Sequence, residues 1–357
     1  MKKLISNFML LTAIAAAFAG CAKSAKTGPN EASIRYFEAW KHVNYPNAET
    51  TPLGSVIIER TDGDASGTEV TNDGFAYVNY ITSSLDGTIG SYTDENTARK
   101  LGTYVEGNYY GPKIMELTDG SIQRGVFELL NGMHIGGHVK AAIPGWLMTS
   151  QIFDTKEQYE ATSTDSDNFI YEFDIVDFTT DVIQWQIDSM GRYMSHHPEI
   201  FADMTVKDTV EGYKGMYYRR LADPVDTTAF PSDTTIYINY TGRLLNGQVF
   251  DTTVEKVAKD NGIYSSTKDY SPVKVKWAEE AKSIELSGSS VITGFALTLW
   301  QMRPMEKGIG MFTSALGYGV SGSGSKIPTY SPLIFEIEIV EETQIEARLN
   351  NLASLTR

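Results

Sequence analysis

The chain has 357 residues, of which 41% are hydrophobic and 11% aromatic, and its formal net charge is −15 at pH 7. This length exceeds that of one ordinary core and predicts two globular domains. The negative charge excludes a general nucleic-acid-binding protein, and it excludes attachment to anionic membranes through a basic patch.

The first residues predict a secretory signal followed by a lipid anchor. Two lysines precede an apolar run from Phe8 to Ala19, which is too short to span a bilayer and fits a signal peptide over residues 1–20. Small residues directly before Cys21, the only cysteine, are typical of a bacterial lipobox. We therefore expect Cys21 to be lipidated and to anchor the protein to a membrane of the cell envelope, facing the periplasm. An ordinary signal peptide cut at another bond is the alternative.

A polar tether containing Pro and Gly is expected over residues 21–32. The spacing of Ile34 and Phe37 then predicts an amphipathic helix over Glu31–His42. Because the chain has no second cysteine, no disulfide bond can form within it. The folded part must therefore be stabilised by a hydrophobic core.

The rest of the chain contains an internal repeat. Three pairs of segments match in the same order, at offsets of 160, 169 and 164 residues: Tyr77–Tyr104 with Tyr237–Tyr264, Met115–Met133 with Ile284–Met302, and Phe169–Val176 with Leu333–Val340. Collinear matches separated by changes in loop length indicate two copies of one fold. The domains are expected over residues 33–180 and 214–343, with a helical connector over 181–213 and a C-terminal helix over 344–357.

The second copy indicates which elements form this fold. Apolar residues alternate along Thr235–Tyr240 and Pro332–Glu341, a pattern typical of strands with one buried face. Between them, Val291–Met302 has apolar residues three and four positions apart, which predicts a short helix capped by Ser289 or Ser290. This order predicts an α+β fold, in which a mostly antiparallel β-sheet curves around one helix in each domain.

Four sequence strings of the second copy are YTGRLLNGQVFD (Tyr240–Asp251), SSVITGFALTL (Ser289–Leu299), ALGYG (Ala315–Gly319) and KIPTYSPLIFEIEIVE (Lys326–Glu341). By these strings, the second copy resembles the FKBP-type peptidyl-prolyl cis/trans isomerases from about Lys214 to Glu342. The resemblance implies two FKBP-like domains, each a half-open antiparallel sheet wrapped on a short α-helix, with isomerase activity in the second. The implied partners are proline-containing unfolded or nascent exported polypeptides. No metal or other cofactor is expected, because isomerisation breaks no covalent bond.

The resemblance also implies nine residues of an apolar pocket. It assigns catalytic roles to Tyr240, Phe250, Asp251, Ile292 and Tyr318, and substrate-binding roles to Val291, Phe295, Ile327 and Phe335. The backbone N–H of Ile292 and the hydroxyl of Tyr318 are expected to hold substrate carbonyls, and Asp251 is expected to orient its neighbours. Taken singly, aromatic residues at alternate strand positions are more typical of a core.

Several features depart from the family pattern. Phe295 stands in the place of the usual tryptophan at the pocket floor, and Thr293 in the place of a proline. The segment Thr253–Lys282 is longer than the usual link between these elements. In this segment, Lys256 is expected to replace an arginine that pairs with the pocket aspartate.

The first copy keeps the framework of the repeat and loses the pocket residues. At the pocket positions it has Gly90, Ser91, Gln123, Val126 and Thr149, and it keeps only the aromatic residues Tyr80 and Tyr171. A pocket without its walls and its acidic residue predicts a degenerate domain with a structural or substrate-holding role.

Other motifs predict no further site. The glycine-rich segment Gly317–Lys326 lacks the Gly-Lys-Ser/Thr order of a phosphate loop and favours a flexible hairpin loop over the pocket. His134 with His138, and His196 with His197, lack the additional ligands of a metal site. The leading hypothesis is an isomerase that assists the folding of exported envelope proteins. The alternatives are a non-catalytic chaperone or peptide-binding lipoprotein, and a structural partner in an envelope complex.

Overall fold

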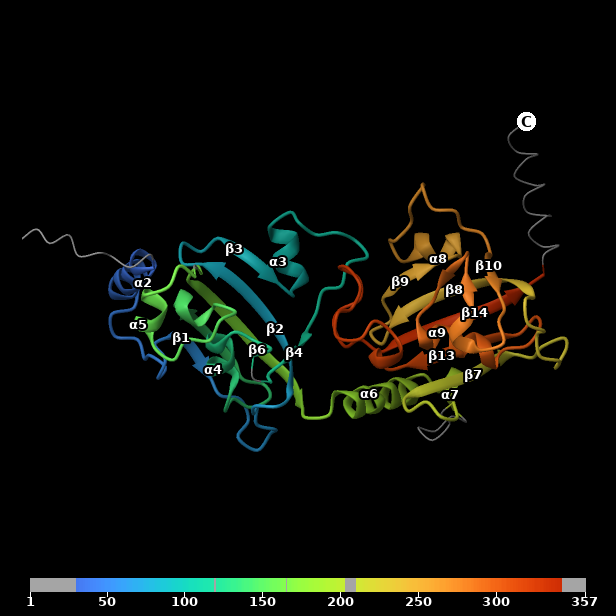
Figure 1. The fold of residues 1–357 in the computed structure, drawn as a ribbon, viewed down its shortest axis with the longest axis horizontal. Helices are drawn as coiled ribbons and strands as arrows, with labels where there is room; N and C mark the ends of the chain where they lie inside the picture. The colour runs from blue at the N-terminus through green and yellow to red at the C-terminus, as the bar shows by residue number, and fades with distance from the viewer. Residues whose placement is uncertain (1–29, 119, 165, 203–209, 342–357) are drawn as a thin grey trace, which may run out of the picture.

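The computed structural model describes residues 30–118, 120–164, 166–202 and 210–341, which form two antiparallel sheets with helices (Figure 1). This confirms the α+β fold class. The expected signal peptide, the lipidation site Cys21 and the C-terminal helix over residues 344–357 lie outside the described residues. None of the described helices is both long and apolar enough to cross a membrane.

The first sheet has six strands in the order β1-β5-β6-β2-β3, with β4 paired to the opposite end of β2. Its strands are β1 (Val56–Thr61), β2 (Phe75–Ser84), β3 (Ile89–Tyr92), β4 (Lys113–Glu116), β5 (His138–Ile143) and β6 (Phe169–Thr179). The helices of this half are α2 (Glu31–Asn44), α3 (Glu95–Lys100), α4 (Arg124–Leu130) and α5 (Lys156–Glu160), with the 3-10 turn η1 (Gly145–Leu147). The connector then forms α6 (Val182–His196) and α7 (Pro198–Phe201).

The second sheet repeats this arrangement, with β7-β13-β14-β8 in the places of β1-β5-β6-β2. β9 and β10 pair with the two ends of β8 as β3 and β4 pair with those of β2, and two short strands extend the sheet beyond β10. Its strands are β7 (Met216–Ala222), β8 (Thr235–Leu244), β9 (Val249–Thr252), β10 (Val273–Lys276), β11 (Glu285–Leu286), β12 (Ser289–Ser290), β13 (Lys307–Phe312) and β14 (Leu333–Val340). The helices of this half are α8 (Glu255–Asp260) and α9 (Thr293–Gln301), with the 3-10 turns η2 (Ala281–Ser283) and η3 (Ser314–Leu316).

Each sheet packs one face against a short helix. Along β14, Phe335, Ile337 and Ile339 belong to the core that includes α9, while Ile334 packs on the opposite face, as the alternating pattern predicts. α9 has nine residues, too few for a helix to be stable in isolation. Burial of its apolar side chains against the sheet therefore holds it in place, and α4 packs in the same way in the first domain.

The opposite face of each sheet is covered by the helix that precedes that sheet in the chain. Phe37 of α2 packs with Val56 of β1. Ile187 and Met190 of α6 pack with Met311 of β13, and α6 lies along the lower edge of the view in Figure 1. Each copy of the repeat therefore consists of a sheet with one helix on either face.

Equivalent elements start at the offsets found in the sequence: 160 residues for β2 and β8, 169 for α4 and α9, and 164 for β6 and β14. The alignment of Met115 with Ile284 is wrong, however. Met115 in β4 pairs with Ala76, and the residue at the equivalent place in the second sheet is Val275, which pairs with Ile236. The offset changes only after β10, because η2, β11 and β12 are inserted there.

A buried carboxylate fixes the start of β13 to β7. Glu306 has no solvent exposure and accepts hydrogen bonds from the Tyr218 hydroxyl, from Arg220 Nε at 3.0 Å and from the backbone N–H of Arg303 at 2.9 Å. Burial and the Glu306 carboxylate raise the pKa of Tyr218 well above its usual range. A buried charge with several donors is stable, whereas one without them is costly.

Candidate active site

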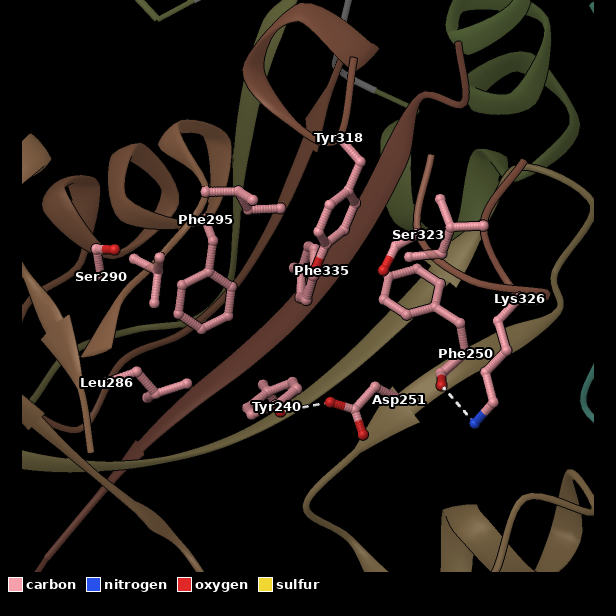
Figure 2. Close-up of a pocket in the computed structure, with 13 residues that line it drawn as sticks. Tyr240, Phe250, Asp251, Leu286, Ser290, Phe295, Tyr318, Ser323, Lys326 and Phe335 are labelled. Atoms are coloured by element: carbon pink, nitrogen blue, oxygen red, sulfur yellow. Dashed lines mark hydrogen bonds between the residues drawn. The ribbon is translucent and has the colours of Figure 1, made fainter. Parts of the chain in front are cut away.

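The nine predicted pocket residues line one open cavity of about 400 Å³ in the second domain (Figure 2). They come from β8, β9 and β14, from the start of α9 and from the loop after η3: Tyr240, Phe250, Asp251, Val291, Ile292, Phe295, Tyr318, Ile327 and Phe335. No residue of the long segment Thr253–Lys282 lines this cavity. The structure thus brings the nine residues together, and their roles in catalysis stay predictions.

Phe335 lies at the centre of the aromatic wall. Its ring meets those of Phe250 and Phe295 edge to face, with centroids 5.5 and 5.0 Å apart, and stacks on Phe312 behind them at 5.9 Å. Tyr240 approaches Phe295 edge to face at 5.6 Å. Such pairs contribute about 0.5–1.5 kcal/mol beyond area burial. The wall is therefore formed by mutual packing before any ligand binds.

Gly242 makes room for this wall, and the sequence analysis missed it. It pairs with Phe335 across β8 and β14, and a Cβ atom at this position would lie 2.5 Å from the ring of Phe250 and 2.9 Å from that of Phe335. The first domain has the reverse arrangement, with Thr82 at the position of Gly242 and Gly90 at that of Phe250. The difference between the two copies could have revealed Gly242, because the 160-residue offset aligns it with Thr82.

Asp251 is held at the rim of the cavity by three donors. The Tyr240 hydroxyl donates to Oδ2 at 2.6 Å, the backbone N–H of Thr252 donates to Oδ1 at 2.9 Å, and the ammonium group of Lys268 pairs with Oδ1. Burial, and then the charge of Asp251, raise the pKa of Tyr240 well above its usual range. The Tyr240 hydroxyl therefore stays protonated at neutral pH and remains a donor.

The prediction that Lys256 pairs with Asp251 is wrong. Lys256 lies on α8 and pairs with Asp260, four positions along the same helix, at 2.5 Å. Side chains four residues apart on a helix lie on the same face, so this local pair forms readily. Lys268 reaches Asp251 from the loop that follows α8.

The start of α9 brings Ile292 to the cavity. Ile292 is the N-cap residue, with φ −61° and ψ 146°, and the helix begins at Thr293. The predicted cap by Ser289 or Ser290 is wrong, because both serines form β12 and no side chain caps α9. The first N–H groups of a helix have no partner within the helix, so backbone donors lie beside the cavity at this point.

Tyr318 extends from the loop after η3 towards Phe335 and lines the cavity (Figure 2). Its side chain is 37% exposed, whereas Phe250, Phe295 and Phe335 are 5% exposed or less. Burial, and then the charge of Asp251, raise the pKa of Tyr318. Its hydroxyl therefore stays protonated at neutral pH, at a position where a bound peptide could accept a hydrogen bond.

Four further residues line the cavity that were not among the nine predicted: Leu286, Ser290, Ser323 and Lys326. The last two belong to the segment Gly317–Lys326, which was expected to lie over the pocket. The first two belong to the inserted hairpin of β11 and β12. The change of offset from 160 to 169 residues marks this insertion and is the signal that could have revealed them. Ser323 and Lys326 lie in the loop after η3, where Lys326 Nζ donates to the carbonyl oxygen of Phe250 at 3.4 Å.

The first domain keeps the elements that surround this site, but the residues equivalent to the pocket residues do not line one common cavity. α4 begins after Gln123 as α9 begins after Ile292, and Thr149 follows η1 as Tyr318 follows η3. Tyr80 lines one cavity, whereas Gln123 and Thr149 line another, of about 130 Å³. These three equivalents of pocket residues therefore do not share one cavity.

One histidine of each predicted pair contacts an acidic residue. Nδ1 of His138 lies 2.8 Å from the carboxylate of Asp174, and Nδ1 of His197 lies 3.1 Å from that of Glu199. Within the described ranges, no group of three or more His, Cys, Asp or Glu side chains is placed to hold a metal ion.

A family model described as FKBP-type peptidyl-prolyl cis-trans isomerase matches residues 227–340. The chain is 26% identical over 155 residues to macrophage infectivity potentiator of Trypanosoma cruzi, over 43% of this chain and 67% of that protein. It is 32% identical over 114 residues to FK506-binding protein 2 of Dictyostelium discoideum, over 32% of this chain and 69% of that protein. A crystal structure of the three FKBP domains of wheat FKBP73 aligns with 80% of this chain and 93% of its own, at 15% identity and a TM-score of 0.28, which is too low to support any inference.

Proposed function

The chain belongs to the FKBP-type peptidyl-prolyl cis-trans isomerases, with the isomerase domain in its C-terminal part, and we propose that the cavity around Phe335 is the catalytic site. We further propose that its substrates are proline-containing exported polypeptides that fold in the cell envelope. One observation carries the proposal for the site. A single open cavity combines a wall of aromatic side chains with a hydrogen-bonded carboxylate at its rim.

The chemistry requires a dry and shaped cavity more than a reactive group. Rotation about an X-Pro amide has a barrier of roughly 18–20 kcal/mol, because the bond has partial double-bond character. The planar amide is more polar than the twisted one, so removing water from the amide lowers the cost of twisting it. No covalent bond breaks, and the reaction therefore needs no nucleophile.

The aromatic wall is suited to hold the proline ring. Tyr240, Phe250, Phe295 and Phe335 enclose an apolar space in which a proline ring excludes water. Their edge-to-face packing keeps this space open without a ligand. We assign to these four side chains the binding of the ring whose preceding amide rotates.

The polar groups at the rim would hold the chain on either side of the proline. We assign the backbone N–H of Ile292 and the hydroxyl of Tyr318 to substrate carbonyls. Asp251 accepts a hydrogen bond from Tyr240 and pairs with Lys268, so its oxygens are already engaged. Its role in this scheme is to fix the Tyr240 ring, and proton transfer is not part of it.

The proposed location in the cell envelope rests on the sequence before Asn30. The apolar run and the small residues before Cys21 support export and lipid attachment. Exported chains fold outside the cytoplasm, and the slow isomerisation of their X-Pro bonds, over tens to hundreds of seconds at 25 °C, can limit that folding. A membrane-anchored isomerase would act at the place where these chains emerge.

An isomerisation assay of the full chain on proline-containing peptides tests the proposed site. We expect acceleration over the uncatalysed rate, and a roughly tenfold or larger loss of kcat/KM in Phe250→Ala, since each 1.36 kcal/mol of lost transition-state binding is tenfold in rate. Tyr240→Phe should also lose activity, whereas Tyr80→Phe, the same change at the equivalent position of the first domain, should not. Full activity in Phe250→Ala would exclude this cavity, and suppression of aggregation without isomerase activity would favour a peptide-binding role.

A further inference from the structure

The loop from Gly317 to Ser331, here named the cavity loop, connects η3 to β14 and lies on the side of the second domain that faces the first domain (Figure 1). One side of it contributes Tyr318, Ser323, Lys326 and Ile327 to the cavity lining. Its other side contacts the first domain through hydrogen bonds. The same short segment therefore belongs to the site and to the interface between the domains.

Hydrogen bonds join the cavity loop to the first domain at two places. At its tip, the backbone N–H of Tyr109 donates to the carbonyl oxygen of Ser325 at 2.8 Å, and the Ser325 hydroxyl donates to Asn108 Oδ1 at 2.6 Å. Closer to β14, the Thr329 hydroxyl donates to the carbonyl oxygen of Ile114 at 3.2 Å. The partners in the first domain come from β4 and from the segment just before it.

Tyr330 makes the contact nearest to β14. Its hydroxyl donates to Glu116 Oε2 at 2.7 Å, and its ring meets that of Phe75 edge to face at 5.3 Å. Burial, with the hydrogen bond to Glu116 and its charge, raises the pKa of Tyr330 to about 12. The backbone of Tyr330 has φ +57°, which is unfavourable for a residue with a Cβ atom and persists only where surrounding contacts hold it.

The cavity loop contains three backbone hydrogen bonds of its own. Ser323 and Ile327 exchange two, of 2.8 and 3.2 Å, and the N–H of Tyr330 donates to the carbonyl oxygen of Gly319, next to Tyr318, at 2.9 Å. Three glycines within Gly319–Gly324 have positive φ, and glycine loses more conformational freedom than any other residue when it is fixed. The contact of Tyr330 with the first domain is therefore linked through one backbone hydrogen bond to the position of Tyr318.

We propose that the first domain positions the cavity loop of the second domain, with Asn108 and Glu116 as positioning residues that act through the loop on Tyr318. The inference rests on the proposed catalytic site. It gives the first domain, which lacks this pocket, a role in isomerisation, because it anchors a loop that forms part of the site in the second domain. In this scheme the substrate binds well only to molecules whose cavity loop is anchored. The apparent affinity is then proportional to the fraction of such molecules. Losing the anchor therefore raises KM more than it lowers kcat.

The experiment compares full-length variants. Asn108→Ala combined with Glu116→Ala removes two anchors without touching the cavity. Glu116→Gln keeps an oxygen acceptor for Tyr330 and serves as the conservative variant. Gln248→Ala is the matched control, because Gln248 Nε2 donates to the carbonyl oxygen of Gly107 at 3.0 Å and so joins the two domains outside the cavity loop.

Two readouts separate the inference from the proposed function. Hydrogen exchange of peptides covering Gly317–Ser331, measured without substrate, should be about tenfold faster in the double variant, because each lost hydrogen bond to a charged or polar partner weakens the anchored state. KM for a proline peptide should rise about fivefold while kcat changes by less than about twofold. Glu116→Gln and Gln248→Ala should stay close to the wild type in both readouts.

Unchanged exchange of the cavity loop in a folded double variant would overturn the inference. An equal effect of Gln248→Ala would also overturn it, because the loop would then respond to any loosening of the interface. If the wild type itself shows no isomerase activity, the proposed function fails, and the exchange result alone decides whether the first domain anchors the loop. Tyr330→Phe, which removes one hydroxyl and keeps the ring, repeats the test in case the double variant does not fold.

Discussion

Replacing Gly242 by threonine, the residue at the equivalent position of the first domain, is expected to displace the wall of the cavity. The new Cβ would lie 2.5 Å from ring atoms of Phe250, whereas carbon atoms in contact lie about 3.5–4.0 Å apart. The Phe250 ring therefore has to move by about 1 Å or more, away from its edge-to-face contact with Phe335. Overpacking of this kind costs about 1–3 kcal/mol, and we expect a loss of about 2 kcal/mol in the free energy of unfolding of the second domain.

Combining Gly242→Thr with Phe250→Gly reproduces the arrangement of the first domain, where Thr82 lies next to Gly90 and its Oγ1 accepts a hydrogen bond from the N–H of Ser91 at 2.9 Å. Phe250→Gly alone leaves a void and should cost about 3 kcal/mol. In the double variant the threonine occupies part of that void and its clash is gone. We therefore expect the double variant to be about 1–3 kcal/mol more stable than the sum of the single losses predicts.

Urea unfolding followed by tryptophan fluorescence measures these stabilities, and the isomerisation assay is run on the same preparations. Activity should fall about tenfold or more in Gly242→Thr and should not return in the double variant, because the wall that holds the proline is absent. Two results would refute the view that Gly242 and Phe250 depend on each other. One is a double variant whose loss in free energy of unfolding equals the sum of the two single losses to within about 0.5 kcal/mol. The other is a Gly242→Thr variant with unchanged kcat/KM.

Three further results are expected. Lys268→Ala should lower kcat/KM by about two- to fivefold, as expected for a partly exposed ion pair, while Lys256→Ala should leave kcat/KM unchanged. A larger loss in Lys256→Ala than in Lys268→Ala would mean that Asp251 pairs with Lys256 in solution. Glu306→Ala should lower the free energy of unfolding by about 2 kcal/mol, because it leaves partly buried donors without their acceptor, and a loss below about 0.5 kcal/mol would show that the site relaxes. Cys21→Ser should abolish labelling by fatty acid and release the protein from the membrane fraction, whereas continued membrane association would exclude Cys21 as the anchor.

The fold could be predicted because it depends on local patterns, and the members of the pocket could be predicted because the second copy resembles a known family. Alternating apolar residues define strands such as β14, and the string Tyr240–Asp251 spans a strand, a turn and the pocket residues that follow it. The repeat added a second line of evidence, because two copies of one fold must place equivalent residues at equivalent sites. Changes in loop length, such as that after β10, shift the offset and leave these patterns intact.

Contacts that depend on the path of a loop could not be predicted in the same way. The family pattern suggested that Lys256 pairs with Asp251, but Lys256 lies on the helix α8, where it pairs with Asp260 four positions along. Lys268 reaches Asp251 only because of how the following loop is folded. The hairpin of β11 and β12 was mistaken for an aligned segment, because its Glu285–Leu286 matches Glu116–Leu117 by chance.

Interface contacts were also beyond the sequence. The bond from the N–H of Tyr109 to the carbonyl oxygen of Ser325 joins two backbone groups, and every residue except proline can supply such a donor. No residue type at either position therefore indicates that the two segments meet.

The matched lengths of β2 and β8 also bear on how the chain folds. Both strands have neighbours on either side in their sheets and share the pattern Tyr-Val/Ile-Asn-Tyr. Each could therefore pair with the neighbours of the other, and such mispairing is a characteristic error of tandem repeats during folding. Short turns join β2 to β3 and β8 to β9, so each pair of strands would move together in a swap. Thr82 would then lie opposite Phe335, at the place of Gly242, where a Cβ would be 2.9 Å from the Phe335 ring, and the place of Phe250 would be left empty. The difference that removes the pocket from one domain therefore also gives each strand a preferred sheet, and favours correct assembly of a chain whose first domain emerges from the ribosome before the second.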